Sequence, residues 1–263
     1  MIKRELRINL KSFLIWLIVL ISIFGIVFIM YPSIMNSENI KNMEELIKIF
    51  PEEMLKMFNM DITSLTSAFG WLKTEGFVLI LLIIGMYSAI LGSNILLKEE
   101  NDGTIEYLYA KPISRNKIIT SKILVGMFYI ILMISIILLF NLVGLSLIED
   151  FDLKLFLLLS ISPILICIPI FFISMIISCI FNKTKKTIGI SIGIVFISYF
   201  LMIISNLSDT TEFFKYFSIY SLGDPRNIIL NNNISFLNII ICIFVSLVFI
   251  FGIYKIYSRK ELV

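Results

Sequence analysis

Residues 123–148 read ILVGMFYIILMISIILLFNLVGLSLI, a continuous apolar run without a charged residue. About 20 apolar helical residues cross the hydrocarbon core of a bilayer, which is about 30 Å thick. The run exceeds this length, and it lacks the alternation of apolar and polar residues that a strand of a membrane barrel requires. It therefore predicts a transmembrane helix, and it decides the fold class.

Five more runs of the same character lie on either side of this one. The first run is too long for the apolar part of a signal peptide, and no small-residue cleavage site follows it, so we expect it to remain as a span. The predicted spans are about 13–33, 76–97, 123–148, 155–181, 188–207 and 235–256. We expect an all-α polytopic membrane protein with one transmembrane domain over residues 1–263.

The composition excludes a soluble globular domain. Of the 263 residues, 59% are hydrophobic and 16% are charged, whereas soluble domains have about 45–50% apolar and about 25% charged residues. Histidine is absent, which excludes catalytic triads, HExxH zinc sites and haem held by histidine. The cysteines Cys167, Cys179 and Cys242 lie in apolar runs without CxxC spacing and fit buried small hydrophobes. We expect neither a catalytic site nor a metal or cofactor site in the chain.

The basic residues predict the orientation. With the N-terminus inside, the inner segments hold 15 of the 22 basic residues and the outer segments hold 13 of the 19 acidic ones. Inner segments of membrane proteins are enriched in Lys and Arg, so both termini are predicted to be cytoplasmic. In residues 1–12, an apolar stripe lies beside a stripe of Lys3, Arg7 and Lys11. This pattern favours an interfacial helix on the membrane, although a simple orientation signal explains it as well.

Several residues in and between the spans suggest local features. Pro163 and Pro169 in the fourth span each remove a helix hydrogen bond and can kink the helix; they fit prolines that the membrane helix tolerates or a point where the span flexes. Gly189 and Gly193 form a GxxxG pattern, which favours close helix packing. The outer segment 34–75 fits amphipathic helices on the span ends or a gate, and the segment 208–234 fits a half-inserted hairpin broken at Gly223 and Pro225.

The inner loop 98–122, KEENDGTIEYLYAKPISRNKIITSK, carries the strongest functional signal. Asp102-Gly103 predicts a turn, after which Thr104 can cap a short helix over residues 104–110. Pro112 ends that helix because the residue before a proline avoids the helical region, and Ser114 can cap the next helix. A short rigid helix beneath the membrane is suited to transmit a movement of a soluble partner to the membrane spans.

This loop resembles the inner loop of bacterial ATP-binding-cassette (ABC) export permeases of the type-2 family. The matching residues are Glu99, Gly103-Thr104, Glu106, Leu108, Pro112-Ile113-Ser114-Arg115 and Lys122. The resemblance implies a permease half whose loop helix, the coupling helix, sits in a groove of a separate ATPase subunit, and two such halves that form one pathway. The residues assigned to ATPase coupling are Glu99, Gly103, Thr104, Glu106, Tyr107, Leu108, Pro112, Ser114 and Arg115.

Roles within the coupling set follow from the resemblance. Glu99 and Glu106 are expected to face basic residues of the ATPase, while Tyr107 and Leu108 fill an apolar pocket. Arg115 is expected to meet partner acids or lipid phosphate.

The chain has no GxxxxGK[ST] phosphate loop, so ATP and Mg²⁺ are expected to bind the partner ATPase, and the chain is not expected to be an enzyme. The spans offer no charged site, which favours an antimicrobial peptide, a drug or a lipid-like molecule as the exported substrate. Membrane lipid is a further expected partner, and nucleic acid is not. The expected location is the bacterial plasma membrane. Two alternatives remain: a secondary transporter, which normally needs ionisable residues inside the membrane, and a non-transporting docking protein.

Overall fold

The computed structural model describes residues 1–34, 67–104, 113–181 and 183–259. These residues form a helical bundle without strands. Six helical stretches are long and apolar enough to cross a membrane: Ile2–Tyr31, Ala68–Ile95, Arg115–Ser146, Leu153–Ile180, Thr184–Ser205 and Phe236–Ser258. The predicted fold class, an all-α polytopic membrane protein, is confirmed.

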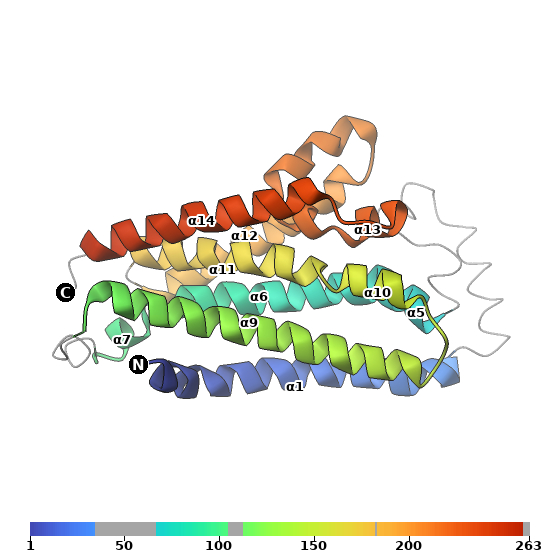
Figure 1. Cartoon of the computed structure of the whole chain (residues 1–263), viewed down its shortest axis with the longest axis horizontal. Coiled ribbons are helices and arrows are strands. Elements are labelled where there is room, and N and C mark those ends of the chain that lie inside the picture. The colour runs from blue at the N-terminus through green and yellow to red at the C-terminus, as the bar shows by residue number, and fades with distance from the viewer. Residues whose placement is uncertain (35–66, 105–112, 182, 260–263) are drawn as a thin grey trace.

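The long helices run side by side, with both termini at one end of the bundle (Figure 1). We call this the termini end, and the other the opposite end. In chain order the elements are α1 (Ile2–Ile34), α5 (Ala68–Trp71), the π-helical turn η1 (Leu72–Gly76), α6 (Phe77–Ile95), α7 (Lys98–Asn101), α9 (Arg115–Ser146), α10 (Leu153–Leu159), α11 (Ser162–Ile180), α12 (Thr184–Ser205), the 3₁₀ helices η2 (Asp209–Phe217) and η3 (Tyr220–Gly223), α13 (Pro225–Asn231) and α14 (Phe236–Arg259).

Helices α6 and α11 form the centre of the bundle. Helix α11 packs against α6, α14, α12 and α9, and α6 also contacts α12, α9 and α1. Small residues of α6 permit the close approach: a Cβ atom on Gly92 would collide with the backbone oxygen of Phe171 on α11. The hydroxyl of Ser93 donates to the hydroxyl of Ser191 on α12 at 2.8 Å, which satisfies two polar groups in an apolar interior.

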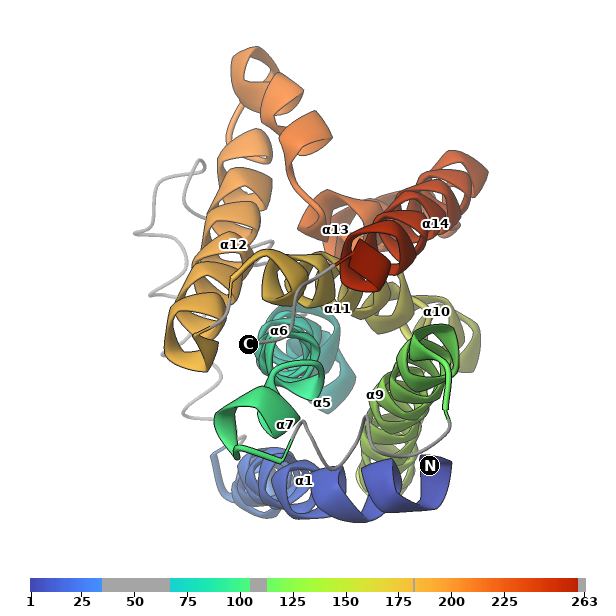
Figure 2. The ribbon, with the colours of Figure 1, turned by 90° about the vertical axis from the view of Figure 1, so that its left-hand side faces the viewer.

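Helices α1, α12 and α14 line the outside of the bundle (Figure 2). Their outward faces carry large apolar side chains, among them Ile29, Ile197 and Phe251, which are 78%, 63% and 70% exposed. Soluble proteins rarely expose contiguous apolar surface of this kind. Such faces are suited to contact with lipid or with another membrane helix.

Two spans differ in detail from the predicted pattern. The second begins at Ala68, not near residue 76, because the π-helical turn η1 continues the helix through Lys73 and Glu75. The fourth is interrupted between Leu159 and Ser162, and Pro163 lies in the first turn of α11. Proline is tolerated there because its missing N–H would have no partner in the helix. Pro169, in contrast, lies inside α11 without ending it.

At the opposite end, the chain between α12 and α14 folds into η2, η3 and α13. Figure 1 shows the first of these pieces projecting away from the bundle. The break expected at Gly223 and Pro225 is present, since η3 ends at Gly223 and α13 begins at Pro225. Gly223 is required because a Cβ atom there would lie 2.7 Å from the backbone oxygen of Ser162. Tyr220 is fully buried, and its hydroxyl donates to the carbonyl of Leu81 at 3.2 Å.

Candidate functional site

The described ends of the inner loop lie at the termini end of the bundle. After α6, the chain forms the single helical turn α7 and leaves it at Gly103, which has a φ of +63°. The amide of Thr104 donates to the carbonyl of Glu99 at 2.9 Å, the type of bond that closes a helix ending in a left-handed glycine. The predicted turn at Asp102-Gly103 is thus present, and it directs the chain into residues 105–112.

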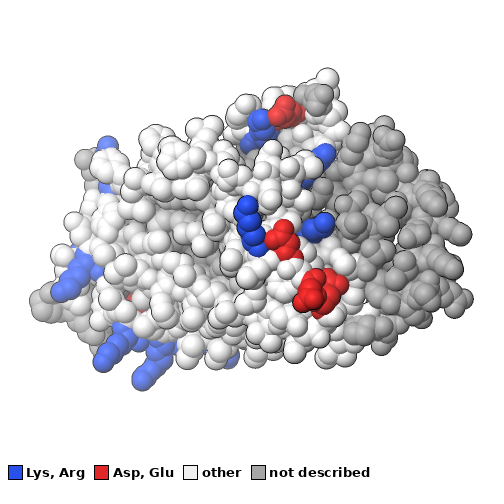
Figure 3. All heavy atoms as spheres, turned by 45° about the vertical axis from the view of Figure 1, so that its right-hand side comes forward, with Lys and Arg blue, Asp and Glu red and all other residues white. Residues whose placement is uncertain are grey.

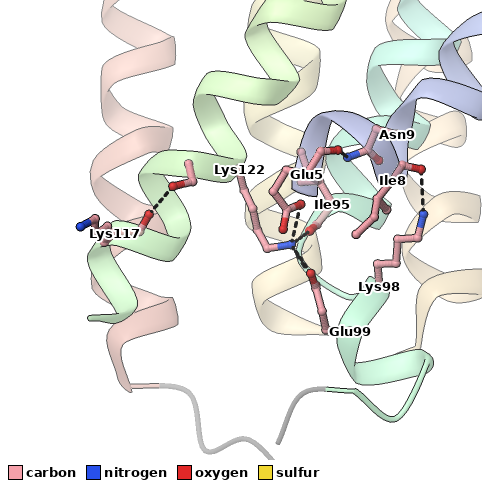
Figure 4. Close-up of polar contacts among 9 residues, drawn as sticks. Glu5, Ile8, Asn9, Ile95, Lys98, Glu99, Lys117 and Lys122 are labelled. Atoms are coloured by element: carbon pink, nitrogen blue, oxygen red, sulfur yellow. Dashed lines mark hydrogen bonds and ion pairs between the residues drawn. The ribbon is translucent and has the colours of Figure 1, made fainter. Parts of the chain in front are cut away.

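Lys122, one turn into the buried part of α9, is the centre of a polar cluster. Its ammonium group donates to Glu99 Oε1 and Oε2 at 3.0 and 2.8 Å, to Glu5 Oε2 at 3.2 Å and to the carbonyl oxygen of Ile95 at 2.6 Å. Figure 4 shows Lys122 extending from α9 toward acceptors from α1, the end of α6 and α7. We call Glu5, Glu99 and Lys122 the ion cluster.

The ion cluster is almost completely shielded from solvent. Lys122, Glu5 and Glu99 are 1%, 1% and 4% exposed. Transferring such charges out of water costs several kcal/mol per ion, which only close pairing and hydrogen bonds offset. One ammonium faces two carboxylates, and Glu5 Oε1 has no hydrogen-bond partner among the described residues. The cluster is therefore an anchor in which each member depends on the others.

Further hydrogen bonds hold the first turns of α1 beside the ion cluster. Lys98 Nζ donates to the carbonyl of Ile8 at 3.3 Å, and the Tyr129 hydroxyl donates to the carbonyl of Leu6 at 2.5 Å. In Figure 2 these first turns of α1 run across the termini end before the helix turns along the bundle. The segment expected to be an interfacial helix is thus joined to both sides of the inner loop.

The far side of the inner loop is attached to the last helix. Ser114 occupies the N-cap position of α9, but its hydroxyl makes no capping hydrogen bond. Arg115 donates from Nη1 to the carbonyl of Ser258 at the end of α14, at 3.0 Å. Thr120 and Tyr254 share a hydrogen bond of 2.6 Å between the same two helices.

The structure shows what Glu99 and Arg115 contact within the chain. The side chain of Glu99 was expected to face basic residues of a partner, but it is buried and pairs with Lys122. Arg115 donates from Nη1 to the Ser258 carbonyl of α14, and its expected contact with partner acids or lipid phosphate stays a prediction. Of the remaining predicted coupling residues, Gly103, Thr104 and Ser114 lie where the loop enters and leaves, whereas Glu106, Tyr107, Leu108 and Pro112 lie outside the described residues.

Sequence reasoning assigned no role to two members of the ion cluster. Lys122 was noted only as a residue of the family pattern. Glu5, which lies among the basic residues of the N-terminal segment, was assigned no role. The available signal was Glu5 itself, the single acidic residue among the first 34.

A second polar cluster lies at the opposite end. Asp224 is 4% exposed and accepts hydrogen bonds from the side-chain amides of Asn206 and Asn227, at 3.0 and 3.1 Å, and from the amide of Arg226 at 3.0 Å. Burial raises the pKa of the Asp224 carboxyl, while the hydrogen bonds from Asn206 and Arg226 oppose that shift. The cluster fixes the turn between η3 and α13.

A groove of about 480 Å³ lies beside this cluster, between η2 and the first turns of α14. Its lining includes the amide side chains of Asn227, Asn231 and Asn238 and the apolar side chains of Leu237, Ile241 and Val245. Glu212 and Lys215, at its rim, form an ion pair of 2.5 Å with each other. The groove is therefore amphipathic. Within the described ranges, no group of three His, Cys, Asp or Glu residues could hold a metal ion.

Comparison with known proteins gives a single finding. The family model described as ABC-2 family transporter protein matches residues 1–262. No curated protein and no solved structure matches the chain significantly. Because the match covers nearly the whole chain, including all six membrane-spanning helices and the ion cluster, the chain belongs to the ABC-2 transporter family.

Proposed function

We propose that the chain is the permease subunit of an ATP-driven exporter in a bacterial plasma membrane. Two permease halves form the translocation pathway, and residues 98–122 couple it to a separate ATPase subunit, which binds ATP and Mg²⁺. The observation that carries the proposal is the anchoring of the inner loop at both ends, through the ion cluster before it and through Arg115 and α14 after it.

The anchoring explains how a soluble partner could move the membrane helices. A flexible connector would absorb a displacement, because its ends could rotate freely. Here, Glu99 at the start of the loop is bonded to α9 and lies in one cluster with α1. A displacement of residues 104–110 is therefore transmitted to α7, α9 and α1 together. Such a joint movement is a rigid-body transition, in which parts of a protein rotate against each other.

The termini end is proposed to face the cytoplasm. On the face in Figure 3, several Lys and Arg side chains gather at this end, while further along the molecule acidic side chains lie together with other Lys and Arg side chains. This distribution supports the orientation expected from the counts of basic residues. An ATPase in the cytoplasm would then meet the inner loop directly.

The second permease half is proposed to pack against α12. Among the described residues, ideal Cβ atoms on Gly189 and Gly193 would have no atom of another element within 4 Å, so the close packing expected of this GxxxG pattern is not made by that part of the chain. Two small residues four positions apart allow close contact between helices in a membrane. A second copy of the chain, or a different permease half, would supply that contact.

The amphipathic groove supports an uncharged or weakly charged amphipathic substrate, such as an antimicrobial peptide, a drug or a lipid-like molecule. Its amides can exchange hydrogen bonds with a polar end, and its apolar side chains can pack on an apolar body. The only charged pair at its rim, among the residues described, is neutralised internally.

The test is purification of the tagged chain from its native membrane, followed by assays of ATPase activity and substrate export. A co-purified ATPase is expected, and the double variant E106Q/L108A should lose export while the chain still inserts. The matched control is K154Q in α10 at the opposite end, which removes an exposed charge outside the groove and the inner loop and should leave export unchanged. Normal export by E106Q/L108A would contradict the proposal. Export without a co-purified ATPase would favour a secondary transporter, and no export would favour a docking protein.

A further inference from the structure

A basic pocket of about 300 Å³ lies at the termini end, between the first turns of α1 and the start of α7. It is lined by Ile8, Lys11, Ser12, Ile15, Trp16 and Lys98. We infer that this pocket binds the phosphate of an anionic membrane phospholipid, with the lipid chains lying along α1. The inference goes beyond the proposed function and does not depend on it.

The polar side of the pocket is suited to a phosphate group. Lys11 makes no hydrogen bond or ion pair with any described residue, and its side chain is exposed. Lys98 donates one hydrogen bond, to the carbonyl of Ile8, which leaves two of its three N–H groups for a ligand. Ser12 also lines the pocket and supplies a hydroxyl group. None of the described residues that line the pocket is acidic, so nothing within it competes with an anion.

The apolar side of the pocket distinguishes a lipid from free phosphate. Ile15 and Trp16 follow Lys11 and Ser12 on the same face of α1, because residues three and four apart are neighbours on a helix. Ile15 is 53% exposed, and Ile18, one turn further along the helix, is 62% exposed. Free phosphate would use only the lysines. A phospholipid would use the lysines for its headgroup, the indole ring at the interface and the exposed apolar residues for its chains.

The location supports this assignment. Clusters of basic residues at the end of membrane helices attract anionic headgroups, and basic pockets between such helices bind them. Lys3 and Arg7 extend the exposed basic surface along the first turns of α1. A phosphate held between Lys11 and Lys98 would also link α1 to α7, next to Glu99 of the ion cluster, and would stabilise the attachment of the inner loop.

Trp16 provides a direct probe, because the chain has only two tryptophans. The other, Trp71, lies at the opposite end in α5. The chain with the W71F substitution is reconstituted in bilayers that contain phosphatidylglycerol or phosphatidylcholine with bromine on the acyl chains, and quenching of Trp16 is measured. Brominated phosphatidylglycerol should quench Trp16 at a lower mole fraction than brominated phosphatidylcholine. The preference should decrease as the salt concentration rises.

Variants separate the pocket from general electrostatic attraction. K11Q and K98Q should each lower the preference for phosphatidylglycerol by about fivefold, from the usual contribution of one basic residue near an anionic surface. K185Q, which removes an exposed lysine at the start of α12, should leave it unchanged. In the W16F chain the fluorescence comes from Trp71, and its quenching should not differ between the two brominated lipids.

Three results would overturn the inference. The first is an unchanged preference in the K11Q/K98Q double variant. The second is a loss as large in K185Q as in that double variant. The third is relief of quenching by millimolar inorganic phosphate without any difference between the two lipids, which would assign the pocket to free phosphate. Helical circular dichroism of each variant, compared with that of the unmodified chain, shows whether the bundle is intact.

Discussion

Replacing Lys122 with methionine tests whether the ion cluster holds the termini end together. Methionine has nearly the length of lysine and no charge, so the change removes the ammonium and its four contacts with Glu5, Glu99 and the Ile95 carbonyl. The two carboxylates then remain buried without a cation. We expect K122M to lower the free energy of unfolding strongly.

The magnitude follows from burial and from the number of bonds. Breaking a buried ion pair by removing one partner costs about 3–5 kcal/mol, because the other charge stays uncompensated. All three residues are at most 4% exposed, so solvent does not screen this loss. The triple variant E5Q/E99Q/K122M removes every charge, and it should regain most of that energy. A deficit of about 1–3 kcal/mol remains expected because the Ile95 carbonyl still lacks its donor.

The assay is unfolding of the purified chain by sodium dodecyl sulfate in mixed micelles, followed by helical circular dichroism. The matched control is K117M, five residues earlier on α9, where the side chain is exposed and a substitution should change stability by less than about 0.5 kcal/mol. E99Q should cost more than E5Q, because Glu99 accepts two bonds from Lys122 and Glu5 accepts one. If K122M matched K117M, or if the triple variant were less stable than K122M, the reasoning about the ion cluster would be wrong.

Three further predictions concern the opposite end and α12. Gly223→Ala places a Cβ atom 2.7 Å from the backbone oxygen of Ser162 and should lower the free energy of unfolding in dodecyl sulfate by about 1–3 kcal/mol. The control is Gly189→Ala, whose Cβ would contact no described atom of another element, and it should change this free energy little. Burial raises the pKa of Asp224, so its contribution to the free energy of unfolding should be largest below the pKa of Asp in the unfolded chain and should fall as the pH rises to the raised pKa of the folded chain. Unfolding midpoints measured against pH report this fall, and Asp224→Asn should abolish it. The double variant Gly189→Leu/Gly193→Leu should weaken the pairing of two permease halves without lowering the stability of the single chain. Crosslinking in native membranes should then show less dimer. An unchanged amount of dimer would place the second half on another face.

The six spans could be predicted because long apolar runs leave few alternatives in a chain of this composition. The error in the second span has a physical cause. Lys73 and Glu75 were taken as the edge of the membrane, and a charge does mark where the hydrocarbon ends. It does not mark where a helix ends, and here the helix continues through a π-helical turn back to Ala68.

The inner loop was predictable in its local chemistry and less so in its contacts. Asp102-Gly103 predicted a turn, and Gly103 adopts the left-handed conformation that such a turn requires. Glu99, in the same stretch, was expected to face basic residues of the partner ATPase. The residues next to Glu99 in the sequence do not indicate that its carboxylate lies against an ammonium from α9 and in one cluster with a carboxylate from α1, because those three positions meet only when the bundle forms.

The ion cluster nevertheless left one trace in the sequence. The first 34 residues contain one acid, Glu5, in a segment whose other charges are all basic. A carboxylate there opposes the positive charge that orients the chain, and burial costs it several kcal/mol. Only a specific cation could compensate both, and Lys122, at the edge of the apolar run 123–148, is buried once the helices pack. An acid in a basic segment and a lysine at a span boundary, taken together, are the pattern that predicts such an anchor.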